Sequence, residues 1–313
     1  MTCRLMVFDH QGMEKHEPDW SNPEQPIRLH AARAAMTGFE GRLRFESAGL
    51  VDRAALMAVH DPIYVDWMLS LEEEEGIVPI DLETAVGPGT VVAACLGSGA
   101  AVDAARRVLA ADAPVRRALI LSRPPGHHAT ADRAMGYCFF NHVAVAAGAA
   151  RAAGAERVLV VDWDVHPGNG TEALLGGREG FLVVDLHEEG QWPGTEGDAP
   201  EGVIRVPVPT GTEHDALVST LREHLQSAVE GFHPDLVLVS AGFDAHEDDP
   251  LGGLCAKDET FLEWGRIVRD IADRHAGGRI VLVLEGGYDI LALGRSLRQV
   301  VTALVEDPPR PAS

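Results

Sequence analysis

The sequence predicts an α/β protein in which helices cover both faces of a mainly parallel sheet. Short apolar runs alternate with longer helical stretches along most of the 313 residues. Several of these runs lead directly into polar clusters, as strands do at the site-bearing edge of an open sheet. No internal repeat and no linker rich in Pro, Gly or Ser divides the chain. We therefore expect one domain over residues 1–313, with a frayed tail at 307–313.

The expected strands are short aliphatic runs that end at Gly, Pro or a charged residue. Runs of this kind are typical of strands that are buried on both faces of a parallel sheet. In chain order they span residues 5–8, 118–121, 158–164, 181–187, 203–208, 236–239 and 280–284.

The expected helices lie between these strands and are longer. Pro62 suits the first turn of the second helix, because proline already has a helical φ and needs no N–H donor there. The third helix is rich in small residues, as expected of a helix that packs closely against a sheet. The predicted helices span residues 27–38, 61–71, 88–110, 141–153, 214–231, 260–275 and 290–305.

Composition excludes several classes of protein. The formal net charge of -22 argues against nucleic acid as a direct partner, since phosphate binding needs clustered Lys and Arg. No apolar stretch approaches the roughly 20 residues of a membrane-spanning helix, and the N-terminus lacks the apolar core of a signal peptide. The four cysteines have no CxxC spacing and indicate reduced thiols. We expect a soluble, cytoplasmic protein.

Polar side chains follow four of the predicted strands. Asp162, Asp164 and His166 alternate along the end of one strand, so they would share a face if the extended backbone continues through them. The tandem His127-His128, Asp244 and Tyr288 follow three other strands. Because parallel strands end at the same edge, these groups are expected to converge. The alternative is a set of surface carboxylates with a capping histidine.

Asp164, His166 and Asp244 form a two-carboxylate, one-imidazole set that suits zinc or another divalent ion with an open position for water. Such an ion lowers the pKa of its water toward about 7, and the tandem histidines would supply the base. Asp162 and Asn169 are candidates to orient those histidines. Tyr288 is a candidate donor to a developing oxyanion.

Five motifs in order then resemble the zinc-dependent histone deacetylase and acetylpolyamine amidohydrolase superfamily, especially its class II and bacterial members. They are RPPGHHA at 123–129, MGYCFFN at 135–141, DWDVHPGNGT at 162–171, AGFD at 241–244 and EGGY at 285–288. The resemblance implies a three-layer α/β/α arginase-deacetylase fold with a sheet of about eight strands. It also implies hydrolysis of an N-acetyl amide to acetate and a free amine.

The resemblance assigns a role to each residue of the site. Asp164, His166 and Asp244 are implied as ligands of one catalytic zinc. His128 is implied as the general base that later protonates the amine, and His127 as its electrostatic partner. Asp162 would stand behind His127 and Asn169 behind His128, while Tyr288 would polarise the acetyl carbonyl together with zinc.

The resemblance also implies how substrate is held. The Gly136 carbonyl would accept the substrate amide N–H, and Tyr137 and Trp192 would wall the acyl-lysine channel, where relatives often have Phe. A structural potassium site is expected from Asp162, Asp164, His166, Asp185 and Leu186, although Asp185 replaces a common Ser and could alter it. Pro167 replaces a second histidine that is not a ligand in relatives.

The resemblance implies that the substrate is an acetylated lysine in a protein or peptide, or a small acetylated amine. An acetylpolyamine is the alternative, although Leu251 stands where a polyamine-selective relative has a gatekeeper Glu. The nearby Glu247, Asp248 and Asp249 are interpreted as a solvated loop, although they could attract a cation. An oligomer is allowed, and the sequence does not predict its size.

Two rival functions stay open. A binuclear manganese ureohydrolase of the arginase type would need a further carboxylate two residues after His166, where this chain has Gly168, although Asp244 to Asp248 mimics an Asp-x-His-x-Asp spacing. The second rival function is that of a catalytically silent acyl-amine binding module. It would not need the complete set of ligands, histidines and Tyr288.

Overall fold

A parallel sheet forms the centre of the molecule. The computed structural model describes residues 3–17, 22–74, 76–194 and 197–306, and within them the main sheet has eight strands in the order β2-β1-β5-β10-β9-β6-β7-β8. All neighbouring strands of this sheet pair in parallel. The strands are β1 (Leu5–Asp9), β2 (Leu43–Ser47), β5 (Arg117–Ile120), β6 (Val158–Asp162), β7 (Phe181–Glu188), β8 (Val203–Val208), β9 (Leu236–Ala241) and β10 (Ile280–Leu284).

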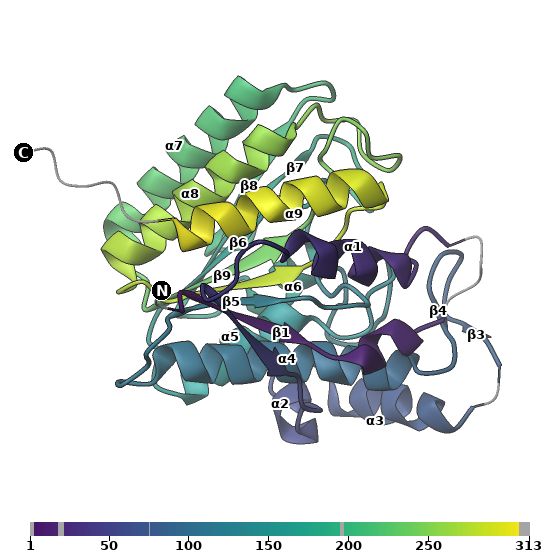
Figure 1. The fold of residues 1–313 in the computed structure, drawn as a ribbon. Coiled ribbons are helices and arrows are strands. Elements are labelled where there is room, and N and C mark those ends of the chain that lie inside the picture. Colours follow the sequence, from purple (N-terminus) through teal and green to yellow (C-terminus); the bar gives the residue numbers. More distant parts are fainter. Residues whose placement is uncertain (1–2, 18–21, 75, 195–196, 307–313) are drawn as a thin grey trace, which may run out of the picture.

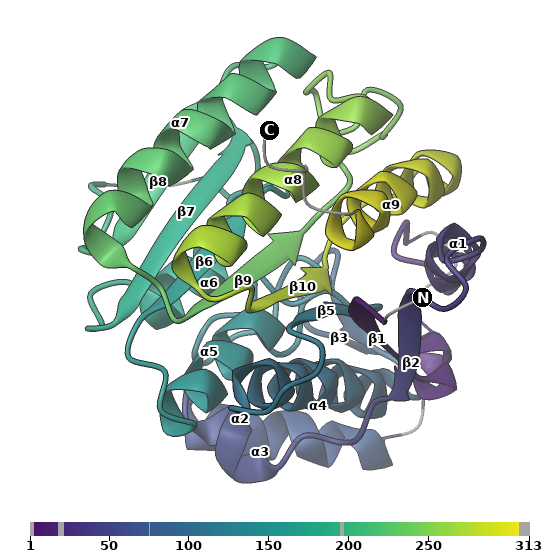
Figure 2. The ribbon, with the colours of Figure 1, turned by 60° about the vertical axis from the view of Figure 1, so that its left-hand side comes forward.

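Helices cover both faces of the sheet, which confirms the predicted three-layer α/β/α fold (Figure 1 and Figure 2). One layer contains α1 (Ile27–Ala35), α7 (His214–Phe232), α8 (Asp258–His275) and α9 (Ile290–Val305). The other contains α2 (Arg53–Met57), α3 (Pro62–Ser70), α4 (Thr90–Leu109) and α5 (His142–Ala152). The short α6 (Asn169–Leu175) packs against α5 and β7. The predicted tail at 307–313 lies outside the described residues.

The core explains why these segments take these structures. Each residue of β6, β9 and β10 is buried, as expected of central strands covered on both faces. On α8, Phe261, Trp264 and Val268 recur at helical spacing and face inward. The small residues of α4 allow close packing, since a Cβ on Gly99 would lie only 1.9 Å from the Gly49 carbonyl oxygen. Among the described residues, no helix combines the length and apolar character needed to cross a bilayer.

The structure contains elements that the sequence did not predict. The edge strand β2 carries charged residues among its apolar ones, and α2 is very short. A small antiparallel pair, β3 (Val78–Pro79) and β4 (Ala85–Val86), lies outside the main sheet. The predicted strand at 158–164 is too long, because β6 ends at Asp162 and the next residues form a loop that leads into α6.

Candidate metal and catalytic site

The predicted site residues gather at the carboxyl ends of four neighbouring strands. β5, β10, β9 and β6 are adjacent at the centre of the sheet. Their ends lie in register, since Asp162 pairs with Ser240 and Ser240 pairs with Val283. The loops that follow therefore leave the sheet side by side, as predicted for an open parallel sheet.

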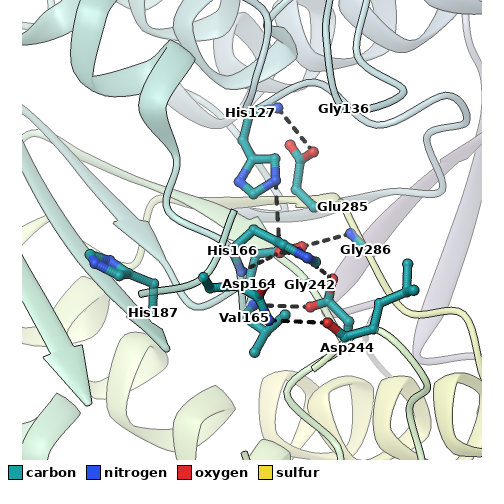
Figure 3. A network of polar contacts seen from close by, with 12 residues as sticks. His127, Gly136, Asp164, Val165, His166, His187, Gly242, Asp244, Glu285 and Gly286 are labelled. Carbon is teal, nitrogen blue, oxygen red and sulfur yellow. Dashed lines mark hydrogen bonds and ion pairs between the residues drawn. The ribbon is translucent and has the colours of Figure 1, made fainter. Parts of the chain in front are cut away.

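Asp164, His166 and Asp244 lie close enough to bind one metal ion. One donor atom from each lies within 4.8 Å of the other two. His166 Nδ1 is 3.0 Å from Asp164 Oδ1 and 3.2 Å from Asp244 Oδ2. The Gly286 N–H donates to Asp164 Oδ2 at 2.8 Å, and the Val165 N–H donates to Asp244 Oδ1 at 3.0 Å. Figure 3 shows the three side chains gathered below His127, with one oxygen of each carboxylate toward His166.

The electrostatics of this cluster fit a cation. Burial and the neighbouring charge of Asp164 raise the pKa of Asp244 to about 7. Burial alone would lower the pKa of His166, but hydrogen bonds to Asp164 and Asp244 raise it to about 10. A divalent ion would take the place of the proton on His166 and neutralise both buried carboxylates. Two oxygens and one imidazole nitrogen are ligands that zinc accepts.

The tandem histidines follow β5, and each has a separate partner. The ring centroids of His127 and His128 lie 3.9 Å apart. His127 Nδ1 is 3.1 Å from Asp162 Oδ2, and His128 Nδ1 is 2.7 Å from Asn169 Oδ1. Because carboxylate and amide oxygens only accept hydrogen bonds, each Nδ1 carries a proton. A neutral His128 therefore presents a lone pair on Nε2.

Their surroundings give the two rings different charges. Burial alone would favour neutral His127, but the carboxylates of Asp164 and Asp162 raise its pKa well above the usual value. Burial, aided by the charges of His127 and His166, lowers the pKa of His128 well below the usual value. The carboxylates thus favour a protonated His127, and the neighbouring histidines favour a neutral His128, which makes His128 the candidate proton acceptor.

Glu285 connects β10 to the histidine loop. Its Oε2 accepts the backbone N–H groups of Gly126 at 2.6 Å and His127 at 3.1 Å, the second of which is seen in Figure 3. Burial raises the pKa of this carboxyl to about 7. The sequence showed Glu285 only as part of a motif, and its contact with residues more than 150 positions away is visible only in the structure.

A narrow pocket opens onto the cluster. Its volume is about 180 Å³, and the rings of Tyr137 and Tyr288 meet edge to face in it at 5.9 Å. The Trp192 ring lies 5.0 Å from that of His128. A side chain at Gly136 has no room, since its Cβ would lie 2.4 Å from the His128 ring. The lining residues are Glu83, His128, Gly136, Tyr137, His166, Gln191, Trp192, Leu251 and Tyr288.

Two buried residues near Tyr288 were not predicted. The Arg28 guanidinium lies 5.0 Å from the centre of the Tyr288 ring, and Arg28 donates to the Gly287 carbonyl at 2.7 Å. Glu24 pairs with Arg28 at 2.9 Å inside the molecule. The available signal was the i,i+4 spacing of these two residues, which is common on exposed helices and indicates no site.

The interpretation of residues 247–249 as a solvated loop is wrong for Asp249. Glu247 and Asp248 are exposed, but Asp249 is only 6% exposed. Its carboxylate accepts three backbone N–H groups, from Leu251, Tyr288 and Asp289. Three neighbouring acidic residues look alike in sequence, and packing against the Tyr288 loop distinguishes one of them.

Of the five residues predicted for a potassium site, Asp164 and His166 belong to the three-residue metal cluster, and the other three lie on β6 and β7. Asp162 and Asp185 are paired in register on β6 and β7, and Leu186 is buried next to them. Asp185 Oδ2 accepts the Gly168 N–H at 3.0 Å, and Oδ1 lies 3.2 Å from His187 Nδ1. Among the described residues this buried Oδ1 nevertheless makes no hydrogen bond, and the potassium site stays a prediction.

The spacing that mimics a second metal site does not add ligands to the cluster. His246 Nε2 lies 3.1 Å from Asp258 Oδ1, and Asp248 pairs with Arg295 at 2.9 Å. A Cβ on Gly168 would lie 2.5 Å from Asp162 Oδ2, so the position of the missing carboxylate has no space for a side chain. Among the described residues, the group with metal-ligand geometry is the set of three above.

Comparison with known proteins connects this geometry to a family. Residues 22–304 match the family model described as the histone deacetylase domain. The chain is 40% identical over 276 residues to a histone deacetylase-like amidohydrolase of Pseudomonas aeruginosa, covering 85% of this chain and 72% of that protein. It is 31% identical over 297 residues to a probable deacetylase of Archaeoglobus fulgidus, covering 91% and 81%. The crystal structure of the HDA15 HD domain superposes with a TM-score of 0.87 at 30% identity, covering 97% and 90% of the two chains.

Proposed function

Because this chain belongs to the histone deacetylase family, we propose that it hydrolyses the N-acetyl amide of an acetylated amine, with one zinc ion as its cofactor. It is a hydrolase, as its relatives named deacetylase and amidohydrolase indicate. The observation that carries the proposal is the convergence of a three-residue metal cluster, a proton-accepting histidine and a tyrosine phenol on one narrow pocket.

Asp164, His166 and Asp244 would hold the zinc ion. When bound, zinc supplies a Lewis acid that polarises a carbonyl and makes water easier to ionise near neutral pH. The arrangement leaves the pocket side of the cluster open to substrate, because His166 itself lines the pocket.

The protein side chains then move the protons. His128 Nε2 takes a proton from the attacking water and later delivers it to the leaving amine nitrogen, so acetate and a free amine result. The hydrogen bond to Asn169 keeps the proton on Nδ1 and the lone pair on Nε2 during the first step. His127, supported by Asp162, acts as the electrostatic partner of the His128 ring, whose centroid lies 3.9 Å away.

Tyr288 stabilises the negative charge that develops on the acetyl group by donating its phenol O–H to the acetyl oxygen. Burial raises the pKa of Tyr288 well above the usual value, although the nearby Arg28 charge opposes this, so the phenol keeps its proton for that hydrogen bond. Tyr288 and His128 both line the pocket and follow different strands, β10 and β5, so the proposal depends on the fold to bring them together.

The pocket suits a thin, extended acyl-amine chain. Tyr137 and Trp192 would flank the chain, and the Gly136 carbonyl would accept its amide N–H. Leu251 at the rim is neutral, which favours an acetyl-lysine peptide or a small acetylated amine over an acetylpolyamine. A competition of acetyl-lysine peptide, acetylputrescine and acetylspermidine, measured as kcat/KM, separates these substrates.

The chemistry is tested by acetate release from the zinc-loaded protein. Tyr288→Phe and His128→Ala should each reduce kcat by at least about a hundredfold, because each removes a group that acts only in the transition state. His30→Ala, which removes an exposed histidine on α1, should leave kcat unchanged. Unchanged turnover in both site variants would refute this mechanism. Binding of an acyl-amine without any acetate release from the zinc-loaded protein would favour the silent binding module.

The metal is tested independently of turnover. After dialysis against zinc and removal of excess, metal analysis should find about one zinc per chain, and Asp244→Asn should lose most of it. Asp248→Asn is the matched control, since that carboxylate is exposed and pairs with Arg295. Two manganese ions per chain, with urea released from a guanidino substrate, would replace this proposal by the ureohydrolase. Comparing activity in potassium and sodium salts tests the separate prediction of a potassium site.

A further inference from the structure

We propose that Asp249 is a positioning residue that holds the backbone of Tyr288, so that the phenol faces the pocket. The inference rests on the proposed function, because it gives Tyr288 the task of donating to the acetyl oxygen. It goes further by adding a buried carboxylate that is neither one of the three candidate metal ligands nor itself a residue of the pocket lining.

The contacts of Asp249 join the pocket rim to Tyr288. Asp249 Oδ2 accepts the N–H of Tyr288 at 2.6 Å and that of Asp289 at 3.0 Å. Its Oδ1 accepts the Leu251 N–H at 3.0 Å. Leu251 and Tyr288 both line the pocket. A single buried carboxylate therefore sets the relative position of two pocket residues that are far apart in sequence.

Tyr288 needs such a restraint because the chain before it is intrinsically free. Gly286 and Gly287 precede it, and Gly287 has a φ of 123°, a region that other residues rarely adopt. Among the described residues, the Tyr288 N–H has a hydrogen bond to Asp249 and to no other group that the structure records. Arg28 contacts the ring face and donates to the Gly287 carbonyl, while Asp249 accepts the Tyr288 N–H. The two side chains therefore hold opposite sides of the planar Gly287–Tyr288 peptide group, and Asp249 is the one that binds on the Tyr288 side.

Starting helix α9 does not require Asp249. The Asp289 side chain caps this helix, and its Oδ1 accepts the Ala292 N–H at 2.7 Å. The two N–H groups that Asp249 accepts belong to Tyr288 and to the capping residue itself. The bond to Tyr288 therefore serves the loop before the helix, where the phenol is placed.

Asp249 begins the loop 249–253, and the far end of this loop is held by a second carboxylate, that of Glu188, which does not contact Tyr288. Glu188 Oε2 accepts the Gly253 N–H at 2.7 Å. Close packing also limits this loop, since a Cβ on Gly252 would lie 2.3 Å from the Asp244 carbonyl oxygen. Glu188 is thus a matched control, a buried carboxylate that anchors the same loop at its other end.

The test is a double-mutant cycle between Asp249→Asn and Tyr288→Phe, measured as kcat and KM for acetate release. The new amide nitrogen cannot accept a hydrogen bond, and the remaining oxygen is uncharged, so Asp249→Asn weakens every anchor that the carboxylate provides, including the one to Tyr288. We expect kcat to fall at least about tenfold with a smaller change in KM, since a phenol acting in the transition state is misplaced. In the Tyr288→Phe background, where no phenol hydroxyl remains, the same substitution should change kcat by less than about threefold.

Glu188→Gln is made in the same two backgrounds and should change kcat by the same factor in both. If Asp249→Asn also reduces kcat by the same factor in the wild-type and Tyr288→Phe backgrounds, the role of Asp249 is only structural and the inference is overturned. If Tyr288→Phe alone leaves kcat unchanged, the proposed chemistry fails instead, so the two failures are distinguishable. Should Asp249→Asn not fold, Asp249→Glu keeps both acceptors, displaced by one methylene, and must show the same dependence on the tyrosine hydroxyl.

Discussion

Replacing the buried carboxylate of Glu24 by an amide should strongly destabilise this protein. Glu24 is fully buried, and its oxygens lie 2.9 Å from Arg28 Nη1, 3.0 Å from Arg123 Nε and 3.3 Å from His16 Nε2. The guanidinium groups of Arg28 and Arg123 are equally buried. Glu24→Gln therefore removes the negative charge that these two cations share, without changing the size of the side chain.

The expected loss follows from the pKa of Glu24. Burial alone would raise this pKa, but the charge of Arg123, the His16 hydrogen bond and the charge of Arg28 together lower it from 4.5 to about 2. At about 1.4 kcal/mol per pKa unit, the carboxylate stabilises the folded state by roughly 3 kcal/mol at neutral pH. Removing one partner of a buried ion pair typically destabilises a protein by about 3–5 kcal/mol, and this range agrees with the value from the pKa.

The same pKa gives the direction of the pH dependence. Since the folded pKa lies below the unfolded one, this stabilisation is complete above about pH 4.5 and is lost as the pH falls toward about 2. Urea unfolding at pH 7 should show Glu24→Gln less stable by roughly 3 kcal/mol or more. Its stability should also depend less on pH between these two values.

An exposed ion pair provides the matched control. Asp66 pairs with Arg53 at 2.6 Å, and both side chains are more than half exposed. Asp66→Asn should change the free energy of unfolding by less than about 0.5 kcal/mol, since water screens this pair. A loss below about 1 kcal/mol in Glu24→Gln would refute the claim that the buried cations depend on this carboxylate.

Two further predictions concern stability. His60 Nε2 accepts the Asn141 N–H at 3.0 Å, and burial lowers the pKa of His60 to about 4, so the free energy of unfolding should fall as the pH drops from about 6.5 to 4. In urea titrations His60→Gln should weaken this dependence, and an identical pH profile would contradict the assignment. Gly99→Ala should cost at least about 2 kcal/mol, because its methyl group would meet the Gly49 carbonyl. Gly231→Ala, with open space around it, should be neutral or slightly stabilising by thermal unfolding, and equal effects at the two glycines would be evidence against the packing argument.

Most of the fold was predictable because its central strands are nearly pure aliphatic runs. The predicted 280–284 strand matches β10, and the predicted 203–208 strand matches β8. The edge strand β2 was missed because Leu43–Ser47 places Arg and Glu next to Leu and Phe, and such a strand depends on pairing with β1 more than on its own composition. The short α6 was missed because its Asn-Gly start is typical of a turn.

The site was predictable where chemistry-bearing residues follow a strand. His127, Asp164 and Asp244 lie near the ends of β5, β6 and β9, and the parallel sheet brings them together. The assumption that an extended strand aligns Asp162, Asp164 and His166 was wrong in detail, because β6 ends at Asp162. The loop still brings Asp164 and His166 into one cluster, because backbone N–H groups of the loop donate to nearby carboxylates. The Asp164 N–H donates to Asp162, the Val165 N–H to Asp244 and the His166 N–H to Asp164.

The sequence by itself determined the layered α/β fold and the groups that gather at the carboxyl edge of the sheet, because aliphatic periodicity and polar residues at strand ends are local properties of the chain. Only the tertiary structure decided which acidic residues are buried and what they hold. Asp248 and Asp249 are neighbours with the same side chain, yet one pairs with Arg295 at the surface and the other anchors Tyr288. Burial and hydrogen-bond partners come from contacts between distant segments, and no local pattern encodes them.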